Sequence, residues 1–186
     1  MTAGRKRSEE SRVAILAATV GLVREAGYGQ LTIEGIAARA GVGKQTIYRW
    51  WPSRADVLFE ALATHADLEI TTTDHGSYRA DLRAFLGETF ALAEASGIAE
   101  ILRSLMAEAQ LDAAFGARFR DAFLARRRGA LRRILDRAAE RGDLPAQPPP
   151  ELAVEVVFGV LWYRVLATRE PMNPSLADDL TTLLIR

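Results

Sequence analysis

The chain has 186 residues, of which 49% are hydrophobic, and carries 24 Lys and Arg against 24 Asp and Glu. This length fits one large domain or two small ones with an ample apolar core. There is no cysteine, which excludes disulfides and thiol chemistry. The basic run of residues 5–7 is followed by Ser8, Glu9 and Glu10 instead of an apolar segment, so we expect no signal peptide and a cytoplasmic location.

The net charge of zero conceals an uneven distribution. Residues 1–59 hold nine Lys or Arg and five acids, whereas the remainder holds fifteen basic residues and nineteen acids. A cationic head on an anionic body would orient the protein toward a polyanion. Two interpretations of Arg5, Lys6 and Arg7 stay open: a disordered solubilising tail, or an arm that reaches phosphates or the minor groove.

The stretch after residue 31 has the pattern of two short helices joined by a tight turn. Thr32 precedes an apolar-periodic run and is a typical N-cap, and its helix extends to about Ala40. Gly41 follows, where helices commonly end on a left-handed residue. A second helix is expected over residues 43–50. Two helices around such a turn are typical of the helix-turn-helix motif, whose second helix reads the DNA major groove.

The second short helix pairs an inward Ile47 with an outward face suited to DNA. Lys, Arg and the hydroxyls of Thr and Tyr suit phosphate oxygens, and Gln can pair with an adenine edge. An ordinary helical corner with a solvated polar face is the alternative. The DNA interpretation is favoured because the outward set contains no acid: Lys44, Gln45, Thr46, Tyr48 and Arg49.

Another helix is expected directly after this motif, from Arg54 to about Ile70. Ser53 is its expected N-cap, and Asp56 three residues later completes a capping-box pattern. The unpaired N–H groups at this helix start and the charge of Arg54 form a natural seat for a phosphate.

With these residues identified, the chain resembles the TetR family of transcriptional regulators. The likeness is close over about 50 residues, and beyond them it is one of length and helix content. The matching positions are Thr32, Ile36, Ala37, Ala40, Gly41, Val42, Lys44, Thr46, Ile47, Tyr48, Trp51, Pro52, Ser53, Arg54 and Leu58.

The resemblance implies how the matched positions would work. Four of them would contact phosphates: Thr32, Thr46, Tyr48 and Arg54. Two would face the groove: Lys44 and Gln45. The predicted DNA-binding set is completed by Gly43 and Arg49.

The chain departs from the family pattern within the motif. Gly43 replaces a frequent Ser that caps the recognition helix and touches a phosphate. Gln45 replaces a frequent Gly and offers a base contact, and Gly35 replaces a frequent acid or Ala, which loses a capping box. Trp51 takes a position usually filled by Phe and would pack under the motif, and Trp50 would either stack at the DNA backbone or shield the core.

The rest of the chain also predicts helices, with no competing strand pattern or repeat. A polar break over residues 71–77 is the expected domain boundary. The helices outside the motif span about residues 8–26, 54–70, 78–95, 98–110, 117–141, 151–168 and 175–186, and the apolar face of the first comprises Val13, Leu16, Val20 and Val23. We predict an all-α protein of about nine helices. Its parts are a helix-turn-helix DNA-binding domain over 1–54, a connecting helix over 54–70, and a helical ligand-binding and dimerisation domain over 71–186.

Nine arginines lie between Arg118 and Arg141. A second polyanion site is one interpretation, but a solvated face is favoured because acids are interspersed among the arginines. The other side of this helix forms an apolar core stripe: Phe115, Phe119, Phe123, Leu131, Ile134, Leu135 and Ala138.

The segment 152–167 is apolar on nearly every side. It is too short, and too interrupted by Glu155 and Arg164, to span a membrane. One face can pack on its own domain, whereas the other needs a partner chain. The last helix carries a similar leucine stripe, so we expect a homodimer through a four-helix bundle. The expected interface residues are Val156, Gly159, Val160, Leu176, Leu180 and Leu183.

These patterns predict a ligand-responsive repressor that binds an inverted repeat in double-stranded DNA as a homodimer. An unknown small-molecule effector would occupy the C-terminal domain, where Arg103 and Arg164 stand in apolar stretches and require a carboxylate of the protein or the ligand. For each pocket candidate, a plain core position is the favoured interpretation and a ligand contact the alternative: Phe90, Leu102, Arg103, Met106, Phe123, Trp162 and Tyr163.

Two alternatives remain from the sequence. One is a helical small-molecule-binding protein or enzyme with a vestigial helix-turn-helix head, and the other is a DNA-binding dimer without a ligand. We expect no catalytic residue, metal or cofactor, because no nucleophile–base grouping or metal-ligand spacing is present. His65 and His75 are the only imidazoles, the first expected to pack or cap on its helix and the second to lie in a loop.

Overall fold

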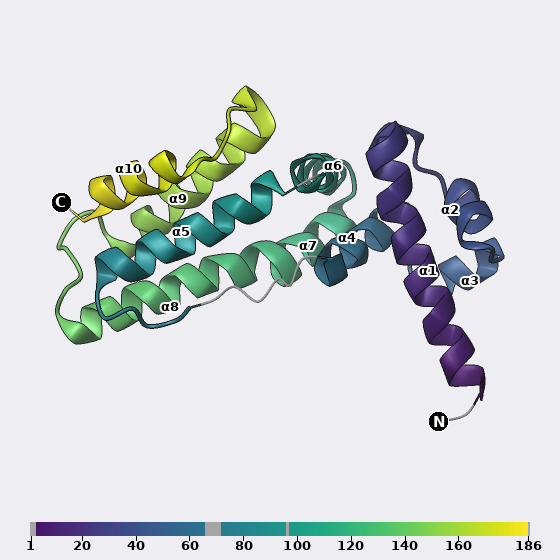
Figure 1. Cartoon of the computed structure of the whole chain (residues 1–186), viewed down its shortest axis with the longest axis horizontal. Helices are drawn as coiled ribbons and strands as arrows, with labels where there is room; N and C mark the ends of the chain where they lie inside the picture. The colour runs from purple at the N-terminus through teal and green to yellow at the C-terminus, as the bar shows by residue number, and fades with distance from the viewer. Residues whose placement is uncertain (1–2, 66–71, 96, 186) are drawn as a thin grey trace. The chain divides into compact units, whose positions relative to one another are not determined.

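The computed structural model describes residues 3–65, 72–95 and 97–185, with side chains from Ser8 onward except that of His65 (Figure 1). No strand occurs among these residues, which confirms the all-α fold class. The elements are α1 (Ala3–Ala26), the 3₁₀ turn η1 (Tyr28–Gln30), α2 (Ile33–Ala40), α3 (Lys44–Tyr48), α4 (Arg54–His65), α5 (Tyr78–Glu94), α6 (Ile98–Leu111), α7 (Ala113–Phe119), the π-helical turn η2 (Arg120–Leu124), α8 (Ala125–Arg141), α9 (Pro150–Tyr163), the π-helical turn η3 (Arg164–Thr168) and α10 (Pro174–Leu184).

Most boundaries fall within a few residues of their predicted places, but three differ. The first helix begins at Ala3, so the backbone of residues 5–7 is helical and is not a disordered tail, whereas contact of this basic run with phosphates stays a prediction. The helix predicted over 117–141 begins at Ala113 and is divided by η2. The final turns predicted for 151–168 are π-helical. The packing predicted for His65 and the helix predicted beyond it lie outside the described residues.

The chain forms two compact units. One comprises Met1–Leu68 with Glu100–Ala117, and the other comprises Glu69–Ala99 with Arg118–Arg186. The division at residues 68 and 69 lies close to the predicted polar break. Residues 100–117, which the sequence placed in the C-terminal domain, instead group with the N-terminal helices. The ring of Phe115 there meets Phe59 of α4 edge to face, with centroids 6.3 Å apart.

The first unit is built around α1, which packs against both α2 and α4. Ile15, Ile36, Ile47 and Leu58 are fully buried and form its core, because each stands on the inward stripe of a different helix. Val13 was predicted on the buried face of α1, but 58% of it is exposed. The apolar residues at 15, 16, 20 and 23 define the buried stripe instead.

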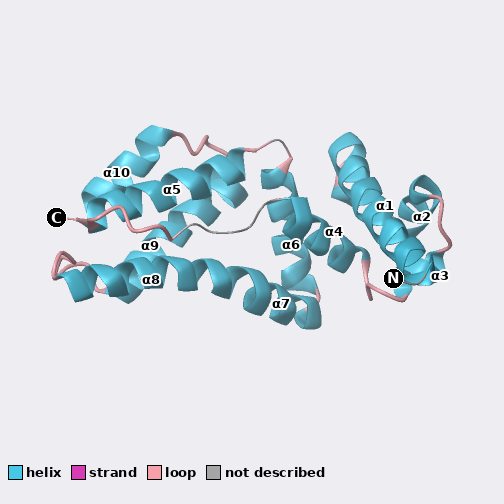
Figure 2. Cartoon of the chain, turned by 60° about the horizontal axis from the view of Figure 1, so that its bottom comes forward, coloured by secondary structure: helices cyan, strands magenta, loops and turns pink. Residues whose placement is uncertain are grey.

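The second unit is a bundle in which α5 packs against α8 and α10, and α8 packs against α9 (Figures 1 and 2). The inward positions of α5 are buried, from Leu82 to Ala93. The predicted stripe from Phe115, which belongs to the first unit, to Ala138 is also buried at each of its seven positions. Helical periodicity therefore identified the inward face from Phe115 to Ala138 correctly.

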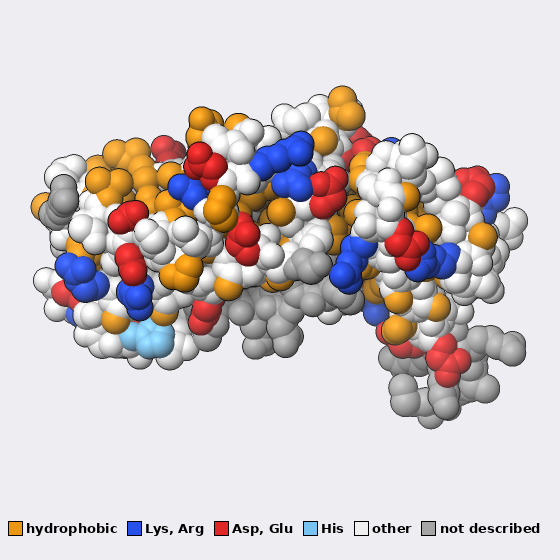
Figure 3. All heavy atoms as spheres, turned by 45° about the horizontal axis from the view of Figure 1, so that its top comes forward, with side chains coloured by type: hydrophobic (Ala, Val, Ile, Leu, Met, Phe, Trp, Pro, Cys, Tyr) orange, Lys and Arg blue, Asp and Glu red, His pale blue; other side chains and the backbone are white. Residues whose placement is uncertain are grey.

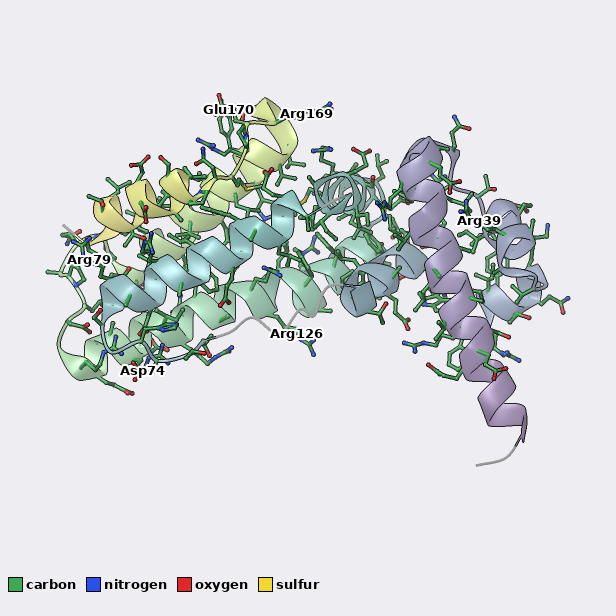
Figure 4. The ribbon with its side chains drawn as sticks, in the orientation of Figure 1. Arg39, Asp74, Arg79, Arg126, Arg169 and Glu170 are labelled. Atoms are coloured by element: carbon green, nitrogen blue, oxygen red, sulfur yellow. The ribbon has the colours of Figure 1, made fainter. Side chains whose placement is uncertain are left out.

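A buried carboxylate ties the start of α5 to the end of α8. Asp81 Oδ2 accepts hydrogen bonds from Arg137 Nη2 (2.9 Å) and Arg141 Nη2 (3.0 Å), and Oδ1 accepts one from the His75 backbone N–H (2.6 Å). Arg141 also donates to Asp74, which lies in the segment before α5 (Figure 4). Burial opposes ionisation of Asp81, but these donors outweigh it and hold the pKa of this carboxyl below its ordinary value.

Replacing Asp81 by Asn should lower the free energy of unfolding by about 3 kcal/mol, because two guanidinium groups lose a buried partner. Since the folded-state pKa is depressed, the stabilisation is present above the ordinary pKa of 3.8 and is lost as the pH falls through the lower folded value. Thermal unfolding between pH 7 and pH 3 measures both effects. Asp136→Asn, an exposed change on α8, is the matched control. Equal melting temperatures for the two variants would contradict this role.

Candidate DNA-binding interface

The turn between α2 and α3 has the predicted geometry. Thr32 caps α2, and its Oγ1 accepts a hydrogen bond from the Gly35 N–H (3.0 Å). A Cβ atom at Gly35 would lie 3.1 Å from that hydroxyl oxygen, so the absence of a side chain leaves room for the cap. Gly41 ends the helix in the left-handed region, with φ 67° and ψ 33°. The predicted N-cap and glycine turn are both confirmed.

The recognition helix α3 exposes the predicted polar face. Ile47 is fully buried, and Thr46 is half-buried at the flank. Gly43 occupies the N-cap position without a side-chain hydrogen bond, as its replacement of Ser implied. The other predicted contacts on and beside this helix are exposed: Lys44, Gln45, Tyr48 and Arg49. Their contact with DNA stays a prediction.

In the free chain, two of these cations already have neighbours. Lys44 Nζ lies 2.9 Å from Glu34 Oε1, and this hydrogen-bonded pair raises the pKa of Lys44 and lowers that of Glu34. The Arg49 guanidinium lies 5.9 Å from the ring centroid of Trp50, which is 44% exposed. A phosphate approaching Lys44 would replace an exposed carboxylate, which costs little because such surface pairs are weak.

An ion pair also joins α2 to α1 beside the motif. Arg39 points from α2 toward α1 (Figure 4) and donates to both carboxylate oxygens of Glu25, at 2.5 and 2.6 Å. A Cβ atom at Gly21 would lie 2.9 Å from Arg39 Nη2, so the absence of a side chain at Gly21 leaves room for this guanidinium. Arg39 is therefore paired with a carboxylate of the protein although its side chain is exposed, as Lys44 of α3 also is.

Arg54, predicted to contact a phosphate at the start of α4, has a structural role as well. Its Nη1 donates to the Leu31 carbonyl oxygen (2.5 Å), and its guanidinium lies 4.6 Å from the ring centroid of Tyr28. The Tyr28 hydroxyl donates to Glu108 Oε2 of α6 (2.9 Å). Burial, followed by this contact with Glu108, raises the pKa of Tyr28. Sequence reasoning missed Tyr28, although an aromatic residue between two glycines was a visible signal.

Glu60 on α4 joins three parts of the first unit. Its Oε2 accepts a hydrogen bond from the Trp51 indole N–H (2.6 Å), and its Oε1 accepts from Arg12 Nε of α1 (2.7 Å) and also from Arg12 Nη2. Trp51 is 2% exposed and directly follows the recognition helix. A Phe at this position could not donate to Glu60. The Trp and Glu therefore form a matched pair that holds the end of the motif against α4 and α1.

The predicted capping box at the start of α4 is present in a modified form. The Asp56 N–H donates to Ser53 Oγ (3.2 Å), and the Ser53 hydroxyl donates to Asp56 Oδ2 (2.6 Å). The N-cap prediction is confirmed, with the Asp56 carboxylate held by the cap hydroxyl.

The predicted ligand-pocket residues are divided between the two units. Leu102, Arg103 and Met106 belong to the first unit, and the other four belong to the second. Phe90 lines an open pocket of about 370 Å³ between α5 and α10, with Arg83, Glu94, Met172 and Asp178 among its walls, and the other six candidates do not line it. Tyr163 is 62% exposed in this chain. Their role in binding a ligand stays a prediction.

The two arginines expected to require a carboxylate both have one in the protein. Arg103 Nη2 lies 2.7 Å from Glu100 Oε2. Arg164 Nη1 donates to the Pro171 carbonyl oxygen (2.5 Å), and its Nη2 lies 3.6 Å from Glu170 Oε2. Neither arginine therefore needs a ligand to balance its charge.

The expected dimer residues include both packed and exposed positions. Leu180 is 5% exposed and packs within its own unit, whereas Leu183 is 54% exposed. Gly159 is exposed, and the remaining three are half-buried: Val156, Val160 and Leu176. Hydrophobic side chains gather on the surface around α9 and α10 (Figure 3).

Two helices, α2 and α3, are joined by a turn at Gly41, and α3 exposes a basic face without acidic residues. This arrangement defines a helix-turn-helix DNA-binding protein. Two family models match this chain. The model described as bacterial regulatory proteins, tetR family, matches residues 15–61, and the model described as Tetracyclin repressor-like, C-terminal domain, matches residues 72–184. The chain belongs to the TetR family and is a DNA-binding transcriptional regulator.

Relatives of known sequence and structure agree. The uncharacterized HTH-type transcriptional regulator YdeS of Bacillus subtilis (strain 168) is 30% identical over 177 residues, which cover 95% of this chain and 89% of YdeS. The DNA-binding transcriptional repressor TetR of Mycobacteroides abscessus is 28% identical over 188 residues, covering 97% and 96%. The relatives are named as regulators, so they give no support to the predicted alternative of an enzyme or carrier.

Solved structures show the same fold. The TetR family transcription regulator SCO0332 has a TM-score of 0.70 and 31% identity, covering 95% of this chain and 97% of its own. The regulator FadR from Bacillus subtilis, solved in complex with stearoyl-CoA, has a TM-score of 0.75 over 93% and 97% of the two chains, and at 20% identity it shows likeness of fold alone. In the part of the chain that the structure describes, no helix is long and apolar enough to cross a membrane.

Replacing Glu60 by Gln should lower the free energy of unfolding by about 1.5–3 kcal/mol, because Arg12 and Trp51 lose a charged acceptor. Trp51→Phe should lower the free energy of unfolding by less, since it removes one hydrogen bond and leaves the ring packing largely in place. Thermal unfolding followed by tryptophan fluorescence measures the Glu60 variant against Glu10→Gln, an exposed change on α1. A Glu60→Gln protein as stable as this control would show that the cluster does not hold the motif.

Proposed function

We propose that the protein is a ligand-responsive repressor that binds an inverted-repeat operator as a homodimer. The exposed, acid-free face of α3 is the observation that carries this proposal. The buried Ile47 and Trp51 hold this face outward, so α3 already presents its polar side chains to a groove. A cytoplasmic location follows from this DNA partner.

In this mechanism, two recognition helices enter successive major grooves roughly 34–36 Å apart, one turn of DNA. The effector prefers a state in which this spacing is wrong, and α4 carries the change because it is part of the DNA-binding unit and leads on to the second unit. A fold neighbour solved with stearoyl-CoA supports a small-molecule effector for this architecture. Selection of bound sequences from random DNA tests the symmetry, since a homodimer should recover an inverted repeat.

The exposed apolar positions of α9 and η3 support the dimer. Residues 152, 156, 159, 163 and 166 recur every three or four positions along one helical face, and each is exposed or half-buried in the single chain. Leu152, Tyr163 and Leu166 are 47%, 62% and 44% exposed. Together with Leu183 on α10, they form an apolar surface that a second copy would cover.

Gln45→Ala should reduce the preference for the selected operator over random DNA by about 1–3 kcal/mol, because a base-edge contact carries sequence information. Arg54→Ala should weaken binding to every duplex and lower the slope of log affinity against log salt by about 1, as for one lost phosphate contact. Fluorescence anisotropy at several salt concentrations measures both. If Arg54 serves only Tyr28 and Leu31, its variant will melt earlier while the salt slope stays unchanged.

Leu183→Glu should convert the dimer to single chains, because a carboxylate would be buried in an apolar interface. Sedimentation velocity at micromolar concentration measures the change. Leu111→Glu is the matched control, since Leu111 is 84% exposed and belongs to the first unit. The proposed interface is wrong if both variants keep the wild-type sedimentation coefficient.

A further inference from the structure

One arginine of α8 does not lie on the solvated face predicted for this helix. Arg127 is only 8% exposed, whereas its neighbours Arg126 and Arg128 are exposed, and Arg126 points away from the bundle (Figure 4). Arginine is almost never this buried without a partner. The burial of Arg127 is therefore unusual for an arginine and requires a physical explanation.

Other arginines of the same helix are paired with carboxylates. Arg137 and Arg141 share the Asp81 carboxylate, and Arg132 Nη1 lies 2.8 Å from Glu151 Oε1. Arg127 makes no hydrogen bond or ion pair with any residue in the described part of the chain. It does contact Phe123, whose ring centroid lies 5.2 Å from the guanidinium carbon. A ring face attracts a cation but does not neutralise it.

Loss of hydration lowers the pKa of Arg127 to about 10, so the side chain is still a cation at neutral pH. A buried charge without a counter-ion destabilises the folded chain. The chain therefore carries a cost at this position that an apolar residue of similar length would avoid. Such costs are characteristic of functional sites.

The guanidinium still faces a space that water can reach. Among the described residues, every buried side-chain nitrogen or oxygen that is closed to solvent has a hydrogen-bond partner. Arg127 has none, so its nitrogen atoms must keep some access. Its N–H donors are consequently desolvated but available, which is the condition in which a guanidinium binds an anion most strongly.

The backbone before Arg127 is also unusual. Phe123 lies in the π-helical turn η2, which ends at Leu124, directly before α8. Single π-turns within α-helices occur frequently at functional sites. This turn brings the Phe123 ring, which is 6% exposed, against the buried guanidinium. A cation beside an apolar ring matches a ligand with an acidic group on an apolar body.

We propose that Arg127 is the anchoring cation for the effector, and that the effector is an organic anion in which a carboxylate, sulfonate or phosphate is attached to an apolar body. This proposal rests on the ligand response proposed above and adds the chemical class of the ligand. The acidic group would pair with the guanidinium, and the apolar part would lie against Phe123. Binding would then remove the cost of the unpaired charge.

Two fluorescent probes of nearly the same shape test the charge requirement. 8-Anilinonaphthalene-1-sulfonate carries a sulfonate, and N-phenyl-1-naphthylamine lacks it. The wild-type dimer should bind the sulfonate at least tenfold more tightly than the neutral probe. Arg127→Met should lose that preference while binding the neutral probe as before. Arg128→Met removes the same charge from the exposed neighbouring position and should behave as wild type.

The stability of the ligand-free variant is a second, independent measurement. Arg127→Met should melt about 2–4 °C above wild type, because a desolvated charge is replaced by an apolar side chain of similar length. An arginine with a purely structural role would give the opposite shift. The proposal is overturned if Arg127→Met melts lower and still prefers the sulfonate, or if wild type binds the two probes equally or binds neither.

Operator binding separates this proposal from the function on which it rests. Arg127→Met should bind selected DNA as wild type does in the absence of any probe, since Arg127 is not part of the DNA-binding unit. Wild-type protein that binds no DNA would refute the proposed function, whatever the probes show. Intact DNA binding without an Arg127-dependent sulfonate preference would refute only the anionic effector.

Discussion

The Glu60 carboxylate is the constraint on which the DNA-binding unit depends. A recognition helix of five residues has too few internal hydrogen bonds to be stable by itself, so its direction must come from what surrounds it. Ile47 anchors it from within, and Trp51 anchors its far end through Glu60 to α1 and α4. Trp51 packs in the core and also donates a hydrogen bond to Glu60. This contact therefore fixes the orientation of the indole ring as well as its burial.

Charges that lie at least partly below the surface are matched by partners in both units, but Arg127 of the second unit differs from them. In the first, the carboxylate of Glu60 is matched by donors, and Arg54 is shared between Leu31 and Tyr28. In the second, Asp81 is matched by two arginines, whereas Arg127 contacts an aromatic ring and has no counter-ion among the residues that the structure describes. A matched charge makes a structure rigid and specific, whereas an unmatched one makes its surroundings responsive to whatever supplies the missing charge.

The motif and the helical faces could be predicted because their causes are local. Thr32, Gly41 and the periodic apolar residues act within one or two turns of chain, and the structure confirms them. Glu60, Tyr28 and Arg127 could not be found in this way. Glu60 and Arg12 are 48 residues apart, and Tyr28 and Glu108 are 80 apart, so their pairing depends on the tertiary fold. Arg127 could not be distinguished by sequence from the neighbouring arginines that face solvent. Val13 was wrongly predicted to be buried, because the buried face of α1 is formed by the positions at 15, 16, 20 and 23.

The path of the chain suggests how the two kinds of site are connected. The chain leaves the first unit at residue 68, returns to it over residues 100–117, and leaves again within α7, two residues before η2 begins at Arg120. Residues 100–117 are therefore covalently joined at both ends to the unit that holds Arg127. Within the first unit, α6 in this segment carries Glu108, which holds Tyr28, and Tyr28 supports Arg54. A change at η2 beside Arg127 would thus reach residues 100–117 through the backbone. Glu108 of this segment holds Tyr28, which supports Arg54, a predicted phosphate contact.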